Sequence, residues 1–158
     1  MKYVFVVNRN AGKGSVAKKW TALEARVAEL FDDYTVVYDL APIAADADVV
    51  VAVGGDGTVH YVVNYLMRCN RHAALGILPL GSGCDFARNF KTEDALAVLA
   101  RGSTKAIDVG EIESAGNKMW FANVADVGMG AEVTRQMANH SRNYLFSTLK
   151  ALVGYKNV

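Results

Sequence analysis

The sequence predicts an α/β fold in which a parallel sheet is flanked by helices. Two all-apolar runs, Tyr3–Val7 and residues 49–53, have the composition of strands that are buried on both faces. Each run ends in a glycine-containing turn, and apolar residues at helical spacing follow. Strands and helices that alternate in this way form parallel sheets, and ligands of such sheets bind beyond the carboxyl ends of the strands.

The first third of the chain contains a strand, a helix and a second strand. Ser15 can cap a single helix after the first strand. The side chains predicted on the inner face of this helix are Val16, Trp20, Leu23, Val27 and Leu30. A short strand is predicted over residues 35–38, and an alanine-rich connection over residues 40–47 leads to the strand that begins at Val49.

A further helix follows the glycine turn after Val53, because the next apolar residues again recur at helical spacing. They are Val59, Val62, Val63, Leu66 and Met67. Residues 75–79 form the next predicted strand. Asp85 is then expected to cap a short helix in which Phe86 and Phe90 pack inward one turn apart.

The next helix is predicted over residues 93–101, and the character of the sequence changes after it. Thr92 begins this helix, Gly102 ends it, and its inward side chains should be Leu96, Leu99 and Ala100. Beyond it, residues 105–109 and 119–124 are predicted strands of a hairpin with a Gly-Asn turn at positions 116 and 117. Residues 131–138 and 144–153 are predicted helices.

Composition restricts the possible classes of function. The 158 residues carry a net charge of +1 without a cluster of Lys or Arg, which argues against a nucleic-acid partner. The apolar run at the N-terminus is too short for a signal peptide or a transmembrane helix, so a cytoplasmic protein is expected. Cys69 and Cys84 lack the spacing of metal ligands and should stay reduced.

The glycine turn at residues 54–58, Gly-Gly-Asp-Gly-Thr, predicts an anion site. A strand, a glycine turn and a helix together present unpaired backbone N–H groups at the positive end of a helix. Glycine lets a phosphate approach the backbone closely, and Thr58 can cap the helix or bond a phosphate oxygen. Asp56 would repel a phosphate unless a cation lies between them or its carboxylate holds the loop amides. The first option implies Mg²⁺.

A second motif completes a family resemblance. Residues 80–88, Leu-Gly-Ser-Gly-Cys-Asp-Phe-Ala-Arg, follow the first motif after about two dozen residues. The pair resembles the catalytic domain of the diacylglycerol kinase family, which shares a superfamily with sphingosine kinases and NAD kinases. The resemblance extends from about Tyr3 to Val153. It implies a nucleotide-binding domain over residues 1–103 and the beginning of a second, β-sandwich domain over residues 104–158. Because most of that sandwich would lie beyond Val158, the chain is expected to be a fragment or to complete itself as a homodimer.

The resemblance assigns three loops to the nucleotide. The first loop contributes Asn8, Arg9, Asn10, Ala11 and Gly12, although Arg9 replaces a proline and Ala11 a serine of relatives. The alternative is that Gly12 and Gly14 only permit a tight turn. The second loop contributes Gly54, Gly55, Asp56, Gly57, Thr58 and His60, with Asp56 orienting a metal ion through water. The third loop contributes Gly81, Ser82 and Gly83.

Two side chains of the third loop have alternative interpretations. Cys84 stands where relatives have Asn, and it is either a reactive thiol or a small residue tolerated beside a helix. Arg88 either reaches a phosphate or forms a surface ion pair.

The implied reaction is lipid phosphorylation. ATP with Mg²⁺ would lie on the three loops, and its γ-phosphate would pass to a hydroxyl of diacylglycerol or a related lipid at a membrane surface. The family's general base would lie beyond Val158. One alternative is an NAD kinase, although the Asn-Glu pair typical of those enzymes is missing after the glycine loop. The other is a non-catalytic nucleotide-binding domain, which Tyr61, Cys84 and the short connection at residues 40–47 favour.

Overall fold

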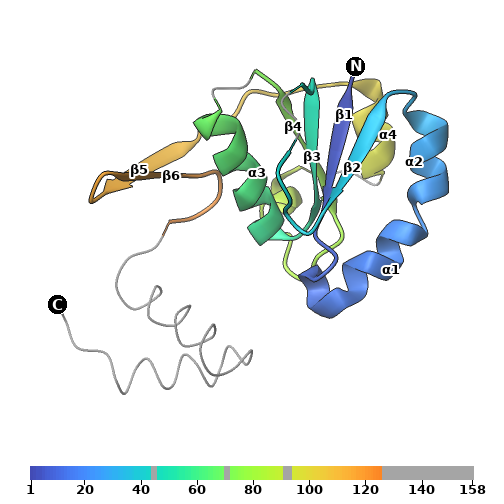
Figure 1. Cartoon of the computed structure of the whole chain (residues 1–158), viewed down its shortest axis with the longest axis horizontal. Coiled ribbons are helices and arrows are strands. Elements are labelled where there is room, and N and C mark those ends of the chain that lie inside the picture. The colour runs from blue at the N-terminus through green and yellow to red at the C-terminus, as the bar shows by residue number, and fades with distance from the viewer. Residues whose placement is uncertain (44–45, 70–71, 91–93, 126–158) are drawn as a thin grey trace. The chain divides into compact units, whose positions relative to one another are not determined.

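Four parallel strands form the central sheet of the computed structural model, in the order β2-β1-β3-β4 (Figure 1). The strands are β1 (Tyr3–Val7), β2 (Tyr34–Tyr38), β3 (Val49–Gly54) and β4 (Ala74–Pro79). The structure describes residues 1–43, 46–69, 72–90 and 94–125. Helices flank the sheet, so the predicted fold class is confirmed.

The register of the sheet brings the carboxyl ends of its strands into one row. Val7 at the end of β1 lies opposite both Tyr38 and Val53, and Val53 lies opposite Leu78. Every residue of β1 and β3 is buried, as expected for the two central strands of a sheet covered on both faces. The loops that follow the strands are therefore neighbours in space.

Helices α1 (Ser15–Thr21), α2 (Glu24–Leu30) and α4 (Ala95–Arg101) cover one face of the sheet. Trp20, Val27 and Leu96 pack there against alternate side chains of β1 and β3. Helix α3 (Asp56–Arg68) covers the other face, where Val59, Val62, Val63 and Leu66 are buried as predicted. Met67, predicted on the same face, is 43% exposed.

The single helix predicted after Ser15 is divided in two, and that prediction was wrong. The amide of Leu23 donates to the carbonyl of Trp20 at 2.8 Å, which tightens the chain between α1 and α2. The second helix is consequently rotated relative to the first. Val27 remains buried, but Leu30, predicted to face inward, is 40% exposed.

The segment between β4 and α4 also differs from its prediction. The short helix is a single 3₁₀ turn, η2 (Ala87–Asn89), and Asp85 does not cap it. Phe86 is buried, whereas Phe90 is 37% exposed, although the two rings contact each other edge to face.

Helix α4 begins at Ala95, two residues later than predicted. Asp94 caps it by accepting a hydrogen bond from the amide of Ala97 at 3.1 Å. The predicted cap, Thr92, lies outside the described residues. Ala100 is exposed rather than buried, and Gly102 ends the helix in the left-handed conformation as expected.

The hairpin is shifted relative to its prediction. Its strands are β5 (Gly110–Ser114) and β6 (Asn117–Phe121), and residues 105–109 are not a strand. Ala115 and Gly116 form the two-residue turn, both with positive φ, which is the geometry that fits the twist of a tight hairpin.

The buried Asn64 of α3 fixes this hairpin. It donates to the carbonyl of Trp120 at 2.7 Å and accepts from the amide of Trp120 at 3.1 Å. Met1–Asn123 forms one compact unit that includes the hairpin. The division into domains at residue 103 stays a prediction, and the helices predicted at 131–138 and 144–153 lie outside the described residues. Among the described helices, none is long and apolar enough to cross a membrane.

Candidate functional site

The three glycine loops meet at the carboxyl edge of the sheet. The amide of Gly81 donates to the carbonyl of Gly54 at 2.8 Å. A Cβ atom added to Gly81 would lie 2.5 Å from the Cα atom of Gly55, and one added to Gly12 would lie 3.7 Å from the Cα atom of Gly81. The third loop is therefore in contact with both of the others, and only glycine at position 81 allows this approach.

The first loop turns through three consecutive left-handed residues. Gly12, Lys13 and Gly14 have φ of 60°, 57° and 84°. Glycine adopts this conformation most easily, and two of the three residues are glycine. The tight turn by itself therefore explains both glycines. A nucleotide contact of this loop stays a prediction.

The second loop presents the N-terminus of a 13-residue helix to solvent. Gly55 is the N-cap of α3, and Asp56 and Gly57 contribute its first N–H groups, which have no intrahelical partner. Gly57 is exposed, and an added Cβ atom would meet no other atom within 4 Å. The backbone at this helix end is thus open to an anion.

Thr58 lies beneath this loop. Its side chain is 1% exposed, and its hydroxyl accepts a hydrogen bond from Nδ2 of Asn8 at 3.3 Å. This contact joins the first loop to the second. Direct contact of Thr58 with a phosphate stays a prediction, and the buried position of its hydroxyl does not favour it.

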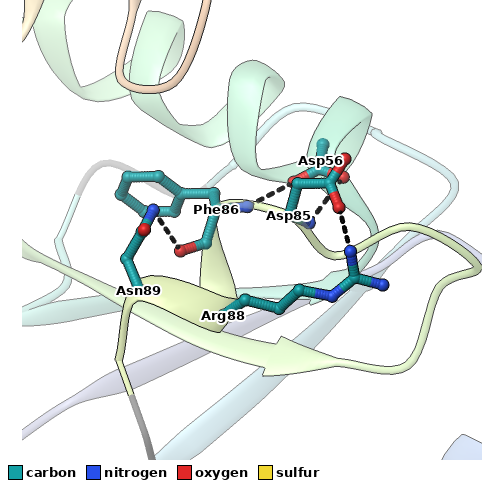
Figure 2. A network of polar contacts seen from close by, with 5 residues as sticks. All are labelled: Asp56, Asp85, Phe86, Arg88 and Asn89. Carbon is teal, nitrogen blue, oxygen red and sulfur yellow. Dashed lines mark hydrogen bonds and ion pairs between the residues drawn. The ribbon is translucent and has the colours of Figure 1, made fainter.

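Asp56 holds the amides of the third loop (Figure 2). Its Oδ1 accepts from the amide of Phe86 at 2.9 Å, and its Oδ2 accepts from the amide of Asp85 at 3.1 Å. Of the two explanations that the sequence left open for Asp56, the structure shows the one in which its carboxylate holds loop amides. Arg88 forms an ion pair with Asp85, which is the surface pair considered from the sequence.

The remaining predicted residues are mostly exposed at the surface of the chain. Ser82 and Gly83 are exposed, and a Cβ atom added to Gly83 would lie 3.0 Å from Oδ2 of Asp56. His60 is exposed on α3, where its ring lies 3.5 Å from the side-chain nitrogen of Asn64. Asn10 is exposed, and Ala11 is half-buried.

An ion pair between Arg9 of the first loop and Asp39, the residue after β2, was not predicted from the sequence. We call this pair the Arg9–Asp39 clamp. The amide of Arg9 donates to Oδ1 of Asp39 at 3.1 Å, and its Nε donates to Oδ2 at 2.9 Å. The guanidinium lies over the ring of Tyr38, 4.8 Å from its centroid. The hydrogen bond from Arg9 lowers the pKa of Asp39 below its ordinary value. No local sequence pattern indicates this pair, because 30 residues separate its members.

Cys84 does not have the properties of a reactive thiol. Burial raises the pKa of its thiol above the ordinary value. A hydrogen bond with the backbone of Gly81 opposes this effect, the negative charge of Asp56 adds to it, and Lys19 and Arg88 lower the pKa by smaller amounts. Its Sγ lies 3.5 Å from the carbonyl oxygen of Gly54. Cys84 has φ of 56°, a conformation in which Asn is more common than Cys.

The metal prediction rests on Asp56 alone. No group of three or more His, Cys, Asp or Glu side chains that could hold a metal ion occurs within the described ranges. Mg²⁺ in phosphoryl-transfer sites is commonly held by one or two carboxylates together with substrate phosphates and water. Asp56 fits such a site, since each of its oxygens accepts one amide and keeps further acceptor capacity.

Comparison with known families decides the assignment. The model of the diacylglycerol kinase catalytic domain matches residues 2–112. The chain belongs to the diacylglycerol kinase catalytic domain family. In this chain the second motif, residues 80–88, is the loop that Asp56 of the first motif anchors.

Individual relatives of the diacylglycerol kinase family agree with this assignment. A "Diacylglycerol kinase" of Bacillus subtilis is 33% identical over 103 residues, covering 62% of this chain and 33% of the relative. A "Probable lipid kinase YegS-like" of Xanthomonas oryzae is 34% identical over 129 residues, covering 77% of this chain and 41% of the relative. The chain thus spans less than half of the length of these curated relatives.

A solved structure shows the same fold. The crystal structure of a diacylglycerol kinase from Bacillus anthracis matches with a TM-score of 0.58 and 25% identity, covering 74% of this chain and 47% of that one.

Proposed function

We propose that this chain binds ATP with Mg²⁺ at the meeting point of the three glycine loops, as the nucleotide-binding part of a lipid kinase. The observation that carries the proposal is the contact between loops that are far apart in the sequence. Gly12 and Gly55 both lie against Gly81, and this close approach brings the N-terminus of α3, with the unpaired amides of Asp56 and Gly57, beside the other two loops.

The roles of individual groups follow from their positions. The amides of Asp56 and Gly57 at the N-terminus of α3 would bind phosphate oxygens, and Gly83 would bring its amide to the same anion. Asp56 would keep the third loop in place through two amides and share Mg²⁺ with the phosphates through water. The bound ion would neutralise charge on the triphosphate.

Phosphoryl transfer depends on positioning and on charge neutralisation more than on covalent help from the protein. Transfer of the γ-phosphate to a lipid hydroxyl is the reaction that fits the family, with diacylglycerol or a related lipid as acceptor. Approach of such an acceptor requires peripheral contact with a membrane. The groups described here contribute the nucleotide half of this reaction.

The test is calorimetric titration of the purified 158-residue chain with ATP and MgCl₂, followed by an assay with γ-labelled ATP and diacylglycerol in mixed micelles. We expect weak, saturable binding of ATP and slow transfer or none. Absence of ATP binding up to millimolar concentrations, to a chain shown to be folded by circular dichroism, would overturn the proposal. Equal binding of an Asp56→Asn variant would count against the assigned role of Asp56.

A further inference from the structure

Lys19 extends from α1 to the place where the first and third glycine loops meet. Its Nζ donates to the carbonyl oxygen of Leu80 at 2.9 Å. Leu80 directly precedes Gly81, whose amide is bonded to Gly54. A Cβ atom added to Gly12 would lie 3.7 Å from the same carbonyl oxygen. The ammonium group is therefore held beside the junction of all three loops, although sequence reasoning did not single it out.

The charge of Lys19 is not neutralised, unlike that of the arginines beside the loops. Arg9 is paired with Asp39, and Arg88 is paired with Asp85. Within the described part of the chain, Lys19 forms no ion pair, and its ammonium group donates to a neutral carbonyl. An ammonium group has three donors, so two remain after the bond to Leu80.

The third loop lies within the electric field of this charge. The pKa of the Cys84 thiol is raised chiefly by burial, and the positive charge of Lys19 acts on it in the opposite direction. Glycine amides and a helix terminus supply only partial positive charges. A triphosphate carries several full negative charges, so a nearby unpaired cation stabilises it substantially more than it stabilises a monophosphate.

We propose that Lys19 is a phosphate-binding residue that contributes an unpaired positive charge for the outer phosphates of the nucleotide. This inference rests on the proposed function, because it names a further residue of the same site. Lys19 keeps its bond to Leu80 or exchanges it for a phosphate oxygen, and in both cases its full charge faces the anion.

A purely structural role makes a different prediction. If Lys19 acted only by holding the Leu80 carbonyl, a neutral N–H donor at position 19 would serve equally well. Loss of the hydrogen bond would then weaken the binding of every nucleotide to the same extent. Lys19→Gln keeps an N–H donor without charge, Lys19→Arg keeps the charge, and Lys19→Met keeps neither. Lys18→Met is the matched control, since Lys18 is exposed on the same helix and its side chain forms no hydrogen bond or ion pair within the described residues.

The experiment is calorimetric titration of the full 158-residue chain and these four variants with ATP, AMP and inorganic tripolyphosphate. Circular dichroism melting verifies the fold of each protein. We expect Lys19→Met and Lys19→Gln to weaken binding of ATP and tripolyphosphate about tenfold and to leave AMP nearly unchanged. Lys19→Arg and Lys18→Met should stay close to the unsubstituted chain.

The outcomes distinguish this inference from the proposed function. If the unsubstituted chain binds ATP and Lys19→Met binds it equally well, the role of Lys19 is refuted while the nucleotide site stands. If Lys19→Gln binds ATP as well as the unsubstituted chain does while Lys19→Met does not, Lys19 is a structural positioning residue. The same conclusion holds if the affinities for ATP and AMP fall together. If the unsubstituted chain binds neither ATP nor tripolyphosphate, the proposed function fails, and the inference falls with it.

Discussion

Oδ1 of Asp56, at the start of α3, accepts a hydrogen bond of 2.9 Å from the amide of Phe86, 30 residues further along the chain. The other oxygen of the same carboxylate accepts from Asp85 (Figure 2). A single side chain thereby fixes the distance between two glycine loops. The Asp of the first motif and the backbone of the second form one structural unit, and substitutions in either loop should affect both.

Replacement of Asp56 by Ala should lower both stability and nucleotide affinity. The substitution removes two charge-assisted hydrogen bonds, at a cost of about 1–3 kcal/mol in the free energy of unfolding. Urea denaturation measures the first effect, and ATP titration measures the second. Asp85→Ala is a suitable control, because it removes a neighbouring exposed carboxylate and leaves both amide bonds to Asp56. An Asp56→Ala chain with unchanged stability would contradict the geometry of this loop.

Two glycine substitutions should have opposite effects on stability. A Cβ atom at position 81 would lie 2.5 Å from backbone of the second loop, so Gly81→Ala should cost about 1–3 kcal/mol and weaken ATP binding. A Cβ atom at position 57 meets nothing within 4 Å, and Ala is the better helix former. Gly57→Ala should therefore stabilise the chain by about 0.5–1 kcal/mol and still weaken ATP binding, because its methyl group occupies the anion's approach. Unimpaired binding by Gly57→Ala would exclude this helix end as the phosphate site.

Cys84→Asn should raise the stability of the chain. Cys84 has φ of 56°, a left-handed conformation that costs a residue with a Cβ atom about 1–2 kcal/mol and that Asn tolerates better. We expect a gain of up to about 1 kcal/mol in urea denaturation. Cys69→Ser is the matched control, since Cys69 is exposed and has ordinary helical φ of −83°. Destabilisation by Cys84→Asn would show that the weak contact of the thiol with Gly54 contributes more to stability than the relief of the left-handed backbone conformation at position 84.

Asn64→Ala should loosen the hairpin from α3. The buried amide of Asn64 makes two hydrogen bonds to the backbone of Trp120, and their loss should cost about 1–3 kcal/mol. Hydrogen exchange of the β5 and β6 amides should accelerate, because the hairpin opens locally. Amides of β1 and β3 exchange through global unfolding, so their exchange should accelerate only as far as the whole chain is destabilised. Met67→Ala provides a control at an exposed position on the same helix. Equal acceleration in all strands would indicate that Asn64 supports the whole unit rather than the hairpin.

The pair of Arg9 and Asp39 should make stability depend on pH in the acid range. Arg9 lowers the pKa of Asp39 in the folded chain below its ordinary value of 3.8. The contribution of the pair is therefore fully present above pH 3.8 and is lost as pH falls through the lowered pKa of the folded state. NMR titration of the Asp39 carboxyl carbon should give a midpoint below 3.8, and Arg9→Met should raise it. An unchanged midpoint in Arg9→Met would refute the clamp.

The sequence was most informative where one physical requirement dominates. Continuous apolar runs such as Tyr3–Val7 have few alternatives to a buried parallel strand, and the glycine loops at strand ends had to lie along one edge of the sheet. The meeting of the loops at the carboxyl edge could therefore be predicted. For Asp56 the sequence left two roles open, binding a cation next to a phosphate or holding the amides of a loop. Both roles place the carboxylate at the same helix end, so the sequence alone could not decide between them.

The wrong predictions concern choices that depend on tertiary contacts. Leu30 continues the helical spacing of Val16, but the tightened turn at Leu23 rotates it away from the sheet. Residues 105–109 have strand-like composition, yet pairing across the Ala115–Gly116 turn selects the following segment. Lys19 and Asp39 act through partners 61 and 30 residues away, and no local pattern identifies such pairs.

The central claim is that three loops bind one polyphosphate together, and amide chemical shifts measured during titration with ATP and Mg²⁺ test it most directly. We predict that the amide signals of Gly12, Gly57 and Gly83 move along a single binding curve, while those of the β5–β6 turn stay in place. Shifts confined to one loop, or shifts centred away from the carboxyl edge of the sheet, would contradict the account.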